Sequence, residues 1–276
     1  MSVHPTAQEL RVKNPQAPRA GFLNQVALIT WRNLVTISRT PSALLPPLVI
    51  SIFFLVIYES TLGKAAGFIP SLSGNSYLGF ILPLSIVSSS LSGSGIAAQN
   101  LVRDIESGYF DKLLLTPVSR AALLLGPILA GALILGIQAS IVVAFALVLG
   151  LESATGLAGL LVVVGLAILL GTGFAGFTVS AALGSGNAAA TQGASFLFFP
   201  LTFLTASFVP LELLSGWLKA AAKLNPITYV LEAMRSVLNS GWDSTLMWQG
   251  ILACLLLGSA MYALAVFALR VRTRRS

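Results

Sequence analysis

Charged side chains are rare in this chain, and six of its 25 lie within residues 103–120. Acidic and basic groups are mixed there on both sides of Gly108, a residue that permits a sharp turn, and next to the apolar Tyr109 and Phe110. Hydrocarbon penalises carboxylates placed this close to it, whereas a protein partner can bind them. These residue types therefore predict a docking surface for a protein partner, with an ordinary solvated loop as the alternative.

Side chains that hydrolyse bonds or hold metal ions are almost absent from the sequence. His4 is the only histidine and Cys254 the only cysteine, so neither a histidine cluster nor an intrachain disulfide can form. The few carboxylates do not form catalytic pairs, and no serine–histidine pair is available. The sequence therefore predicts no catalytic residue and no metal site.

Two glycine patterns look like nucleotide-binding motifs but stand in the wrong setting. GTGFAG, residues 171–176, lies within an apolar run, where small residues let helices approach each other closely. Gly126 and Gly131 are spaced like the glycines of a phosphate-binding loop, but Ala132 stands where the lysine of that loop must be. We therefore expect no cofactor in this chain.

The composition is that of an integral membrane protein. Of the 276 residues, 56% are hydrophobic and only 9% are charged, against about 25% charged residues in soluble domains. The mean hydropathy is +0.89. A helix needs roughly 20 mostly apolar residues to cross a bilayer. Six segments qualify, so we predict an all-α integral membrane protein with six transmembrane helices near residues 42–58, 76–98, 118–149, 156–183, 193–211 and 246–269.

The Lys and Arg residues predict how these spans are oriented. Twelve of the 16 lie on the side of the membrane that holds the N-terminus, and four lie on the other side, namely Lys64, Lys219, Lys223 and Arg235. Basic residues favour the cytoplasmic side, so both termini are predicted to be cytoplasmic in a multi-pass protein of the cell membrane. The net charge of +7 is then a topology signal, and no nucleic-acid partner is expected.

Residues 22–38 have the period of an amphipathic helix lying on the inner membrane surface. A mere continuation of the first span is the alternative, which Arg32, Arg39 and Pro41 disfavour. The polar half is predicted to hold Asn24, Gln25, Arg32, Asn33 and Thr36, and the apolar half Leu23, Val26, Ala27, Trp31, Leu34 and Ile37.

Two pairs of a capping residue and a proline predict helix starts, since Asn and Thr cap helices and Pro suits the first helical position. Thr116–Pro117 should start the third span. Asn225–Pro226 should start a helix that ends near Asn239, with Glu232 and Arg235 paired on one face. That helix and the apolar piece before it are too short and too charged to cross, so short helices in the outer leaflet are predicted.

Residues 106–120 and 225–235, ESGYFDKLLLTPVSR and NPITYVLEAMR, resemble the two signatures of ABC-2 type permeases. These are the membrane subunits of many bacterial ABC exporters, and the similarity is greatest to the daunorubicin-exporter group. The resemblance covers nearly the whole chain and implies one transmembrane domain over 1–276. Within it, 1–41 would be a tail and interface helix, 42–269 the six-span bundle and 270–276 a basic tail.

The resemblance also implies partners and a coupling role. The expected partners are two copies of an ABC ATPase subunit, which would hold ATP and Mg²⁺, a second copy of this chain or a homologous permease, and membrane lipid. In such families the loop after the second span is a coupling helix that docks on the ATPase. That role would fall on Arg103, Asp104, Glu106, Gly108 and Phe110.

A route for cargo is expected at the dimer axis, because six spans per chain are too few to enclose a wide path. The second and fifth spans would line it, with polar contacts from Ser88 and Ser92 and apolar contacts from Phe199 and Phe203. Helix packing and lipid contact are the alternatives for these side chains. The exit would be capped by Asn225, Pro226, Thr228, Tyr229, Glu232 and Arg235.

These features predict a permease subunit of an ATP-driven exporter rather than an enzyme. Its cargo would be amphiphilic or hydrophobic: a drug, lipid, polyketide or glycan. A self-sufficient channel or secondary transporter is the alternative, although no span has an ionisable residue near its middle, where ion-coupled transporters usually need one. A scaffold without transport is a further alternative.

Overall fold

The computed structural model describes residues 21–63, 77–205 and 211–275. Every regular element in these ranges is a helix, which confirms the all-α prediction. The α-helices, with one 3₁₀ turn (η2) and one π turn (η3), are α1 Phe22–Ser38, α2 Pro41–Leu62, α3 Tyr77–Gly93, α4 Gly95–Glu106, α5 Tyr109–Leu114, α6 Arg120–Val148, α7 Gly156–Ser185, α8 Ala188–Ser195, α9 Phe198–Phe203, η2 Leu211–Leu213, α10 Gly216–Leu224, α11 Pro226–Arg235, η3 Ser236–Ser240 and α12 Ser244–Arg275.

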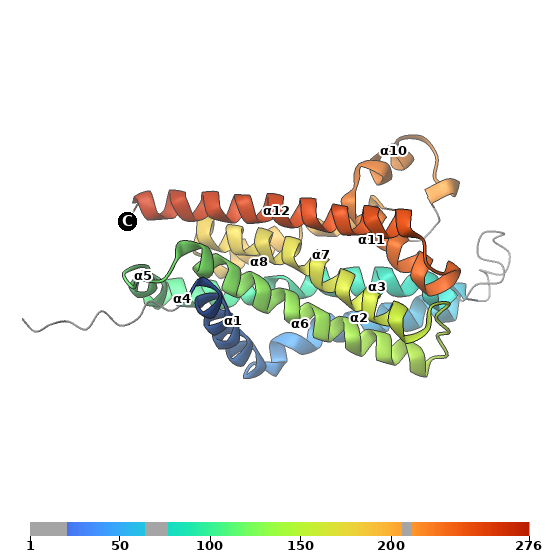
Figure 1. Ribbon diagram of the computed structural model, residues 1–276, viewed down its shortest axis with the longest axis horizontal. Helices are drawn as coiled ribbons and strands as arrows, with labels where there is room; N and C mark the ends of the chain where they lie inside the picture. The colour runs from blue at the N-terminus through green and yellow to red at the C-terminus, as the bar shows by residue number, and fades with distance from the viewer. Residues whose placement is uncertain (1–20, 64–76, 206–210, 276) are drawn as a thin grey trace, which may run out of the picture.

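Five helices in the described ranges are long and apolar enough to cross a membrane. They correspond to the predicted first, second, third, fourth and sixth spans, and α3 and α4 together form the second. In Figure 1, α6, α7 and α12 run along the long axis of the molecule. The five are Pro41–Thr61, Tyr77–Glu106, Arg120–Val148, Gly156–Ser185 and Ser244–Arg274.

The predicted fifth span, residues 193–211, is not one long helix in the described residues. It contains the end of α8, a turn at Phe196 and Leu197, and α9, while residues 206–210 lie outside the described ranges. Pro200 explains the break, because proline lacks an N–H and its ring clashes with the carbonyl four residues earlier, which here belongs to Phe196. A six-span arrangement is therefore not confirmed by helix length alone.

The molecule has two distinct ends (Figure 1). At one end, called the α1 end, lie α1, α5 and the last turns of α12; at the other, called the α11 end, lie α10, α11 and the loop between α6 and α7. The helix α1 runs across the long axis, as both views show. The short helix α8 packs beside α4 and α7, whereas α9 packs beside α3, so this segment leads from the α1 end towards the α11 end.

Helix α7 is the centre of the bundle, and its glycines allow close packing. A Cβ added to Gly171 would meet Leu135 of α6 at 2.9 Å, and one added to Gly176 would meet Met261 of α12 at 3.1 Å. At Gly173, the nearest side chain is Leu257, also of α12, at 2.9 Å. The interpretation of GTGFAG as a helix-packing segment is thus confirmed.

Several of the second-span serines serve helix packing. Ser85, Ser89 and Ser90 are buried, and the Ser90 hydroxyl donates to the carbonyl of Ile86 at 2.9 Å. The hydroxyl of Ser51 on α2 donates to the Ser85 carbonyl at 2.7 Å. These hydroxyls therefore bind backbone within α3 or across to a neighbouring helix.

The predicted start of the third span is wrong by three residues. Helix α6 begins at Arg120, and its cap is Ser119, whose hydroxyl accepts a hydrogen bond from the Ala122 N–H at 3.1 Å. The Thr116 hydroxyl instead donates to the Leu113 carbonyl at 2.6 Å, at the end of α5. Both residues can cap a helix, and the extended backbone of Ser119 (ψ 137°) is the conformation that a cap requires.

Candidate functional site

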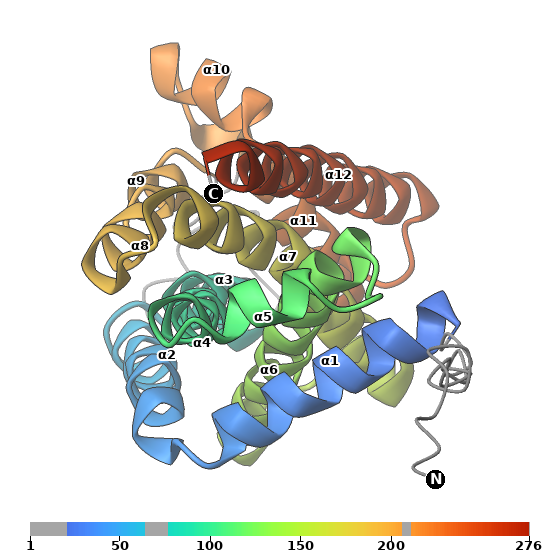
Figure 2. The same ribbon diagram turned by 90° about the vertical axis from the view of Figure 1, so that its left-hand side faces the viewer.

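The predicted docking segment forms a helix–turn–helix at the α1 end, which faces the viewer in Figure 2. Helix α4 ends at Glu106 and α5 begins at Tyr109. Between them, Gly108 has φ +69°, a left-handed conformation that disfavours any residue with a side chain. The segment therefore owes its sharp turn to the glycine, as the sequence predicted.

An ion pair joins this segment to α1. The Arg32 guanidinium donates to both carboxylate oxygens of Asp104, at 2.8 and 2.6 Å, and lies over the Tyr109 ring at 4.3 Å from its centre. The hydrogen bonds to Asp104 raise the pKa of Arg32 above its ordinary value. Two of the predicted surface groups, Asp104 and the Tyr109 ring, are thus engaged within the chain and brace the α4–α5 turn against α1.

The five predicted coupling residues take different places in this turn. Arg103 and Glu106 are exposed, as are Asp111 and Lys112 on α5. By contrast, the Phe110 side chain is only 1% exposed and packs into the core at the α1 end. The exposed surface of the α4–α5 turn therefore carries mixed charges, while the buried Phe110 side chain anchors α5 to the core. A further apolar side chain, Leu115, is 88% exposed beside these charges, and no pattern in the sequence singles it out.

The interface helix α1 has the bounds that its period predicted, but its faces differ from the prediction. Its buried stripe, packed against α6, consists of Val26, Thr30, Asn33 and Ile37. Asn33 was placed on the polar, water-facing half; it is instead buried and donates to the Ile29 carbonyl at 2.9 Å. Satisfying its amide within its own helix lets this polar residue face the bundle.

Apolar side chains of α1 are also exposed. Leu23 is 78% and Trp31 67% exposed, on the half that the sequence assigned to the membrane surface. A third direction is polar: Gln25 accepts a hydrogen bond from the Ser119 N–H at 2.9 Å, close to the start of α6. The helix thus contacts the bundle, the docking segment and the surroundings with three different faces.

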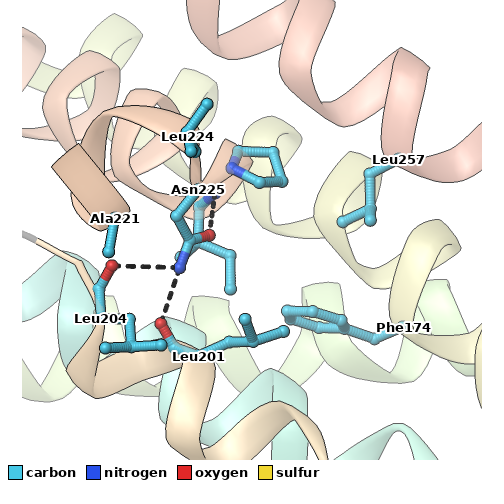
Figure 3. Close-up of a pocket in the computed structure, with 9 residues that line it drawn as sticks. Phe174, Leu201, Leu204, Ala221, Leu224, Asn225 and Leu257 are labelled. Carbon is cyan, nitrogen blue, oxygen red and sulfur yellow. Dashed lines mark hydrogen bonds between the residues drawn. The ribbon is translucent and has the colours of Figure 1, made fainter.

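The Asn225–Pro226 segment lies at the α11 end, and its cap is confirmed. The Asn225 side-chain oxygen accepts a hydrogen bond from the Ile227 N–H at 3.0 Å, and Pro226 occupies the first helical position. The amide nitrogen of Asn225 also donates to the carbonyls of Leu201 and Leu204, at 2.7 and 3.3 Å (Figure 3). The sequence did not predict this link between the start of α11 and the end of α9.

The far end of α11 is fixed to the start of α3 through Arg235. Its side chain is 7% exposed, its Nε donates to the Phe80 carbonyl at 3.0 Å, and the guanidinium lies 3.6 Å from the centre of the Phe80 ring. Burial lowers the pKa of Arg235 to about 9, while the charge of Glu232 acts in the opposite direction. The charge of Glu232, three residues earlier on α11, thus favours the charged form of Arg235, while a direct pair between the two side chains stays a prediction.

Of the remaining residues of the predicted exit cap, Tyr229 also ties α11 to its surroundings. The Tyr229 hydroxyl donates to the Lys223 carbonyl at 2.7 Å, which joins α11 to α10. Thr228 is fully buried. Helical structure continues as a π turn to Ser240, and Gly241 with φ +108° ends it, close to the predicted stop at Asn239.

Two of the four predicted route residues meet in a small hollow. Ser88 of α3 and Phe203 of α9 line a space of about 40 Å³ together with Phe54, Tyr58, Leu84, Ser85 and Thr202. The side chains of Ser92 and Phe199 lie outside the described part of the chain. Sequence reasoning did not predict that α2 also lines this hollow. Its Tyr58 contributes an aromatic ring with a polar hydroxyl.

A larger cavity of about 310 Å³ lies between α7, α9, α10, α11 and α12 (Figure 3). Only its Asn225 and Pro226 were predicted as site residues. Among the residues that the structure describes, no group of three or more His, Cys, Asp or Glu side chains is placed to hold a metal ion. The lining of the cavity is Phe174, Leu201, Leu204, Ala221, Leu224, Asn225, Pro226, Ile227 and Leu257.

The chain is similar in sequence to a known protein family and to several known proteins. A family model described as ABC-2 type transporter matches residues 24–239. A probable doxorubicin resistance ABC transporter permease protein of Mycobacterium tuberculosis is 27% identical over 241 residues, which cover 86% of each chain. A daunorubicin resistance ABC transporter permease protein of Streptomyces coeruleorubidus is 26% identical over 276 aligned positions, 97% of this chain and 92% of the relative. A putative transport permease of Cyanophora paradoxa is 25% identical over 253 residues, 91% of this chain and 82% of the relative.

Proposed function

The chain belongs to the ABC-2 type transporter family, and from this premise we propose that it is the membrane-spanning permease subunit of an ATP-driven ABC exporter. Its sequence has no nucleotide-binding loop, so a separate ABC ATPase subunit binds ATP and Mg²⁺ and hydrolyses the nucleotide. Two permease chains, identical or homologous, and two ATPase subunits form the working transporter.

One observation carries this proposal beyond the family name: the braced turn between α4 and α5. Arg103, Glu106, Asp111 and Lys112 are exposed at its tip, on the end of the bundle that also holds α1. The Arg32–Asp104 ion pair and buried Phe110 hold this tip in place from two sides. A rigid, charged projection of this kind suits a contact that transmits force from a soluble partner.

We infer that the chain crosses the membrane six times, with the fifth crossing made by a broken segment. Helix α7 ends at the α1 end and α12 begins at the α11 end, so the intervening residues cover the length of the bundle. The packing of α8 beside α4 and of α9 beside α3 supports this course. The exposed Lys and Arg residues near α1 and the end of α12 favour the cytoplasm for the α1 end.

The cargo is amphiphilic and drug-like, as the names of the doxorubicin and daunorubicin resistance relatives suggest. The hollow at Ser88 and Phe203 measures about 40 Å³, far below the roughly 300–1,000 Å³ of ligand pockets. A route along α3 and α9 must therefore be completed by the second permease chain, with Ser88 and Phe203 on its wall.

The test is ATP-dependent uptake of a fluorescent anthracycline into inverted membrane vesicles that contain the chain and an ABC ATPase subunit. We expect uptake to require ATP, and Glu106→Lys to abolish it while the chain remains in the membrane. Glu152→Lys is the matched control, because Glu152 is an exposed carboxylate in the α6–α7 loop at the opposite end. Uptake that persists without ATP and responds to an ion gradient would instead identify a secondary transporter, and equal uptake by both variants would remove the docking role.

A further inference from the structure

The larger cavity is an unassigned feature of the α11 end. At about 310 Å³, its volume reaches the lower end of the range for ligand pockets, roughly 300–1,000 Å³. Residues of five helices line it, from α7 to α12. Figure 3 shows Leu224 and Asn225 on one side, Leu201 and Leu204 below them, and Phe174 and Leu257 across the gap. An apolar cavity of this kind does not hold ordered water but accepts apolar guests.

The lining leaves no polar group for a polar ligand. Eight of the nine lining side chains are apolar, and the ninth is Asn225. Its amide oxygen accepts from the Ile227 N–H, and its amide nitrogen donates to the Leu201 and Leu204 carbonyls. Because the Asn225 amide already forms hydrogen bonds with the helix ends around it, a ligand in this cavity must be apolar.

The edge of the cavity continues into exposed apolar surface. Leu224 at the edge is 85% exposed. On α12, next to the lining residue Leu257, Leu252 and Leu256 are 56% and 61% exposed on a helix whose apolar window is mostly unburied. An acyl chain of a neighbouring lipid can therefore enter without crossing a polar rim.

Helix α10 separates this apolar edge from positive charge. At 100° per residue, Ala221 and Leu224 lie on one side of α10, with Trp217 between them and 75% exposed. Lys219 and Lys223, four residues apart, lie on the opposite side. Tryptophan and lysine together are typical of the headgroup level of a bilayer, and lysines there attract anionic headgroups.

We propose that the cavity binds one acyl chain of an anionic phospholipid from the leaflet at the α11 end, with its headgroup beside α10. The bound chain fills the space between α7, α9 and α12 and packs against the short helices α10 and α11. The proposal rests on membrane insertion of the chain and not on its role in export, so lipid binding and transport are tested by separate measurements.

The test uses the full chain in vesicles that contain a phosphatidylglycerol with a photoreactive diazirine in its acyl chain. After illumination, peptide mass spectrometry should find adducts concentrated on residues 201–204, 221–227 and 257. Ala221→Phe fills the cavity and should lower these adducts by about tenfold, equivalent to about 1.4 kcal/mol of binding free energy. Ala220→Phe is the matched control, because Ala220 is exposed on the same helix and does not line the cavity; its adducts should stay at the wild-type level.

A second variant shows whether a loss of adducts in Ala221→Phe comes from filling the cavity or from misfolding. Leu201→Trp fills the cavity from α9 and should also lower the adducts while labelling of the exposed face of α2 is unchanged. Adducts spread evenly over exposed helix faces, or unchanged in both filled variants, would overturn the proposal. A Leu224→Cys variant tests whether a second copy of the chain covers the cavity instead. Efficient disulfide formation between two copies, without lipid adducts, would also overturn the proposal. Equal labelling by phosphatidylcholine would overturn the assignment of an anionic headgroup.

Discussion

Two residues in this chain act by joining elements that are far apart in sequence. Arg32 on α1 forms an ion pair with Asp104 on α4, and Asn225 links α9 to α11 through its hydrogen bonds. A partly exposed ion pair is worth roughly 0–1 kcal/mol, so Arg32 contributes more to the orientation of the α4–α5 turn than to stability. Asn225 is buried, and its loss leaves carbonyls and an N–H without partners, which costs more.

The two roles of Asn225 can be separated by substitution. Serine caps helices about as well as asparagine but is too short to reach the Leu201 and Leu204 carbonyls, whereas alanine does neither. We expect the free energy of unfolding to fall by about 1–3 kcal/mol in Asn225→Ser, from the lost carbonyl bonds, and by about 1 kcal/mol more in Asn225→Ala, from the lost cap.

Thermal unfolding of the purified chain in detergent measures both steps. The order of Tm should be wild type, then Asn225→Ser, then Asn225→Ala. If the serine variant melts with the wild type, the bonds to α9 contribute nothing; if it melts with the alanine variant, the cap contributes nothing. Ser119→Ala at the start of α6 is a useful comparison, because the Ser119 side chain caps its own helix and the backbone bond from its N–H to Gln25 does not need that side chain.

At the level of elements, local signals were predictable and distant contacts were not. The period of residues 22–38 gave the bounds of α1, and the Asn–Pro pair gave the start of α11, since both depend on neighbours in sequence. The cap of α6 was misplaced because Thr116 and Ser119 carry the same local signal. The Arg32–Asp104 pair joins residues 72 apart in sequence, so no local sequence pattern predicts it.

A glycine of α6, Gly126, lets α1 pack closely against α6. Ile29 lies directly on Gly126, so closely that an added Cβ would overlap its side chain. Gly126→Val should therefore push α1 away from α6, at a cost of about 1–3 kcal/mol for overpacking. Separation of the two helices should make Arg32 accessible to trypsin and weaken its ion pair with Asp104.

Limited proteolysis in detergent, followed by mass spectrometry of the cut at Arg32, checks this expectation. Gly165→Val is the matched control, because Gly165 lies inside α7 with no neighbouring atom within 4 Å of an added Cβ. Rapid cleavage of the Gly126 variant alone is the expected result. Equal resistance of both variants would mean that α1 adjusts without leaving α6.

On the scale of the whole molecule, hydropathy predicts six spans, and five of them have a matching long helix in the described residues, because long apolar helices carry their own signal. The predicted fifth span is not a single helix there, because Pro200 interrupts it. The cavity at the α11 end could not be predicted, since its lining comes from five helices. Charge alone predicts which end faces the cytoplasm, and the proposed docking role of the α4–α5 turn depends on that prediction.

The orientation can be measured by labelling with a membrane-impermeant maleimide in intact cells. With Cys254 replaced by serine, we introduce a single cysteine at Ser107, in the α4–α5 turn, or at Ser240, after α11; both positions are exposed. Because basic residues favour the cytoplasmic side, the cysteine at 240 should react from outside and the cysteine at 107 should not.

Permeabilised cells provide the control, since both cysteines should then react to the same extent. A cysteine at Glu152 extends the comparison, because the α6–α7 loop lies at the α11 end and should label like position 240. Reaction of position 107 in intact cells would place the α4–α5 turn outside, where no ATPase subunit could reach it. Opposite labelling at 152 and 240 would mean that the segment between α7 and α12 does not complete a crossing, because an odd number of crossings would then separate these two loops.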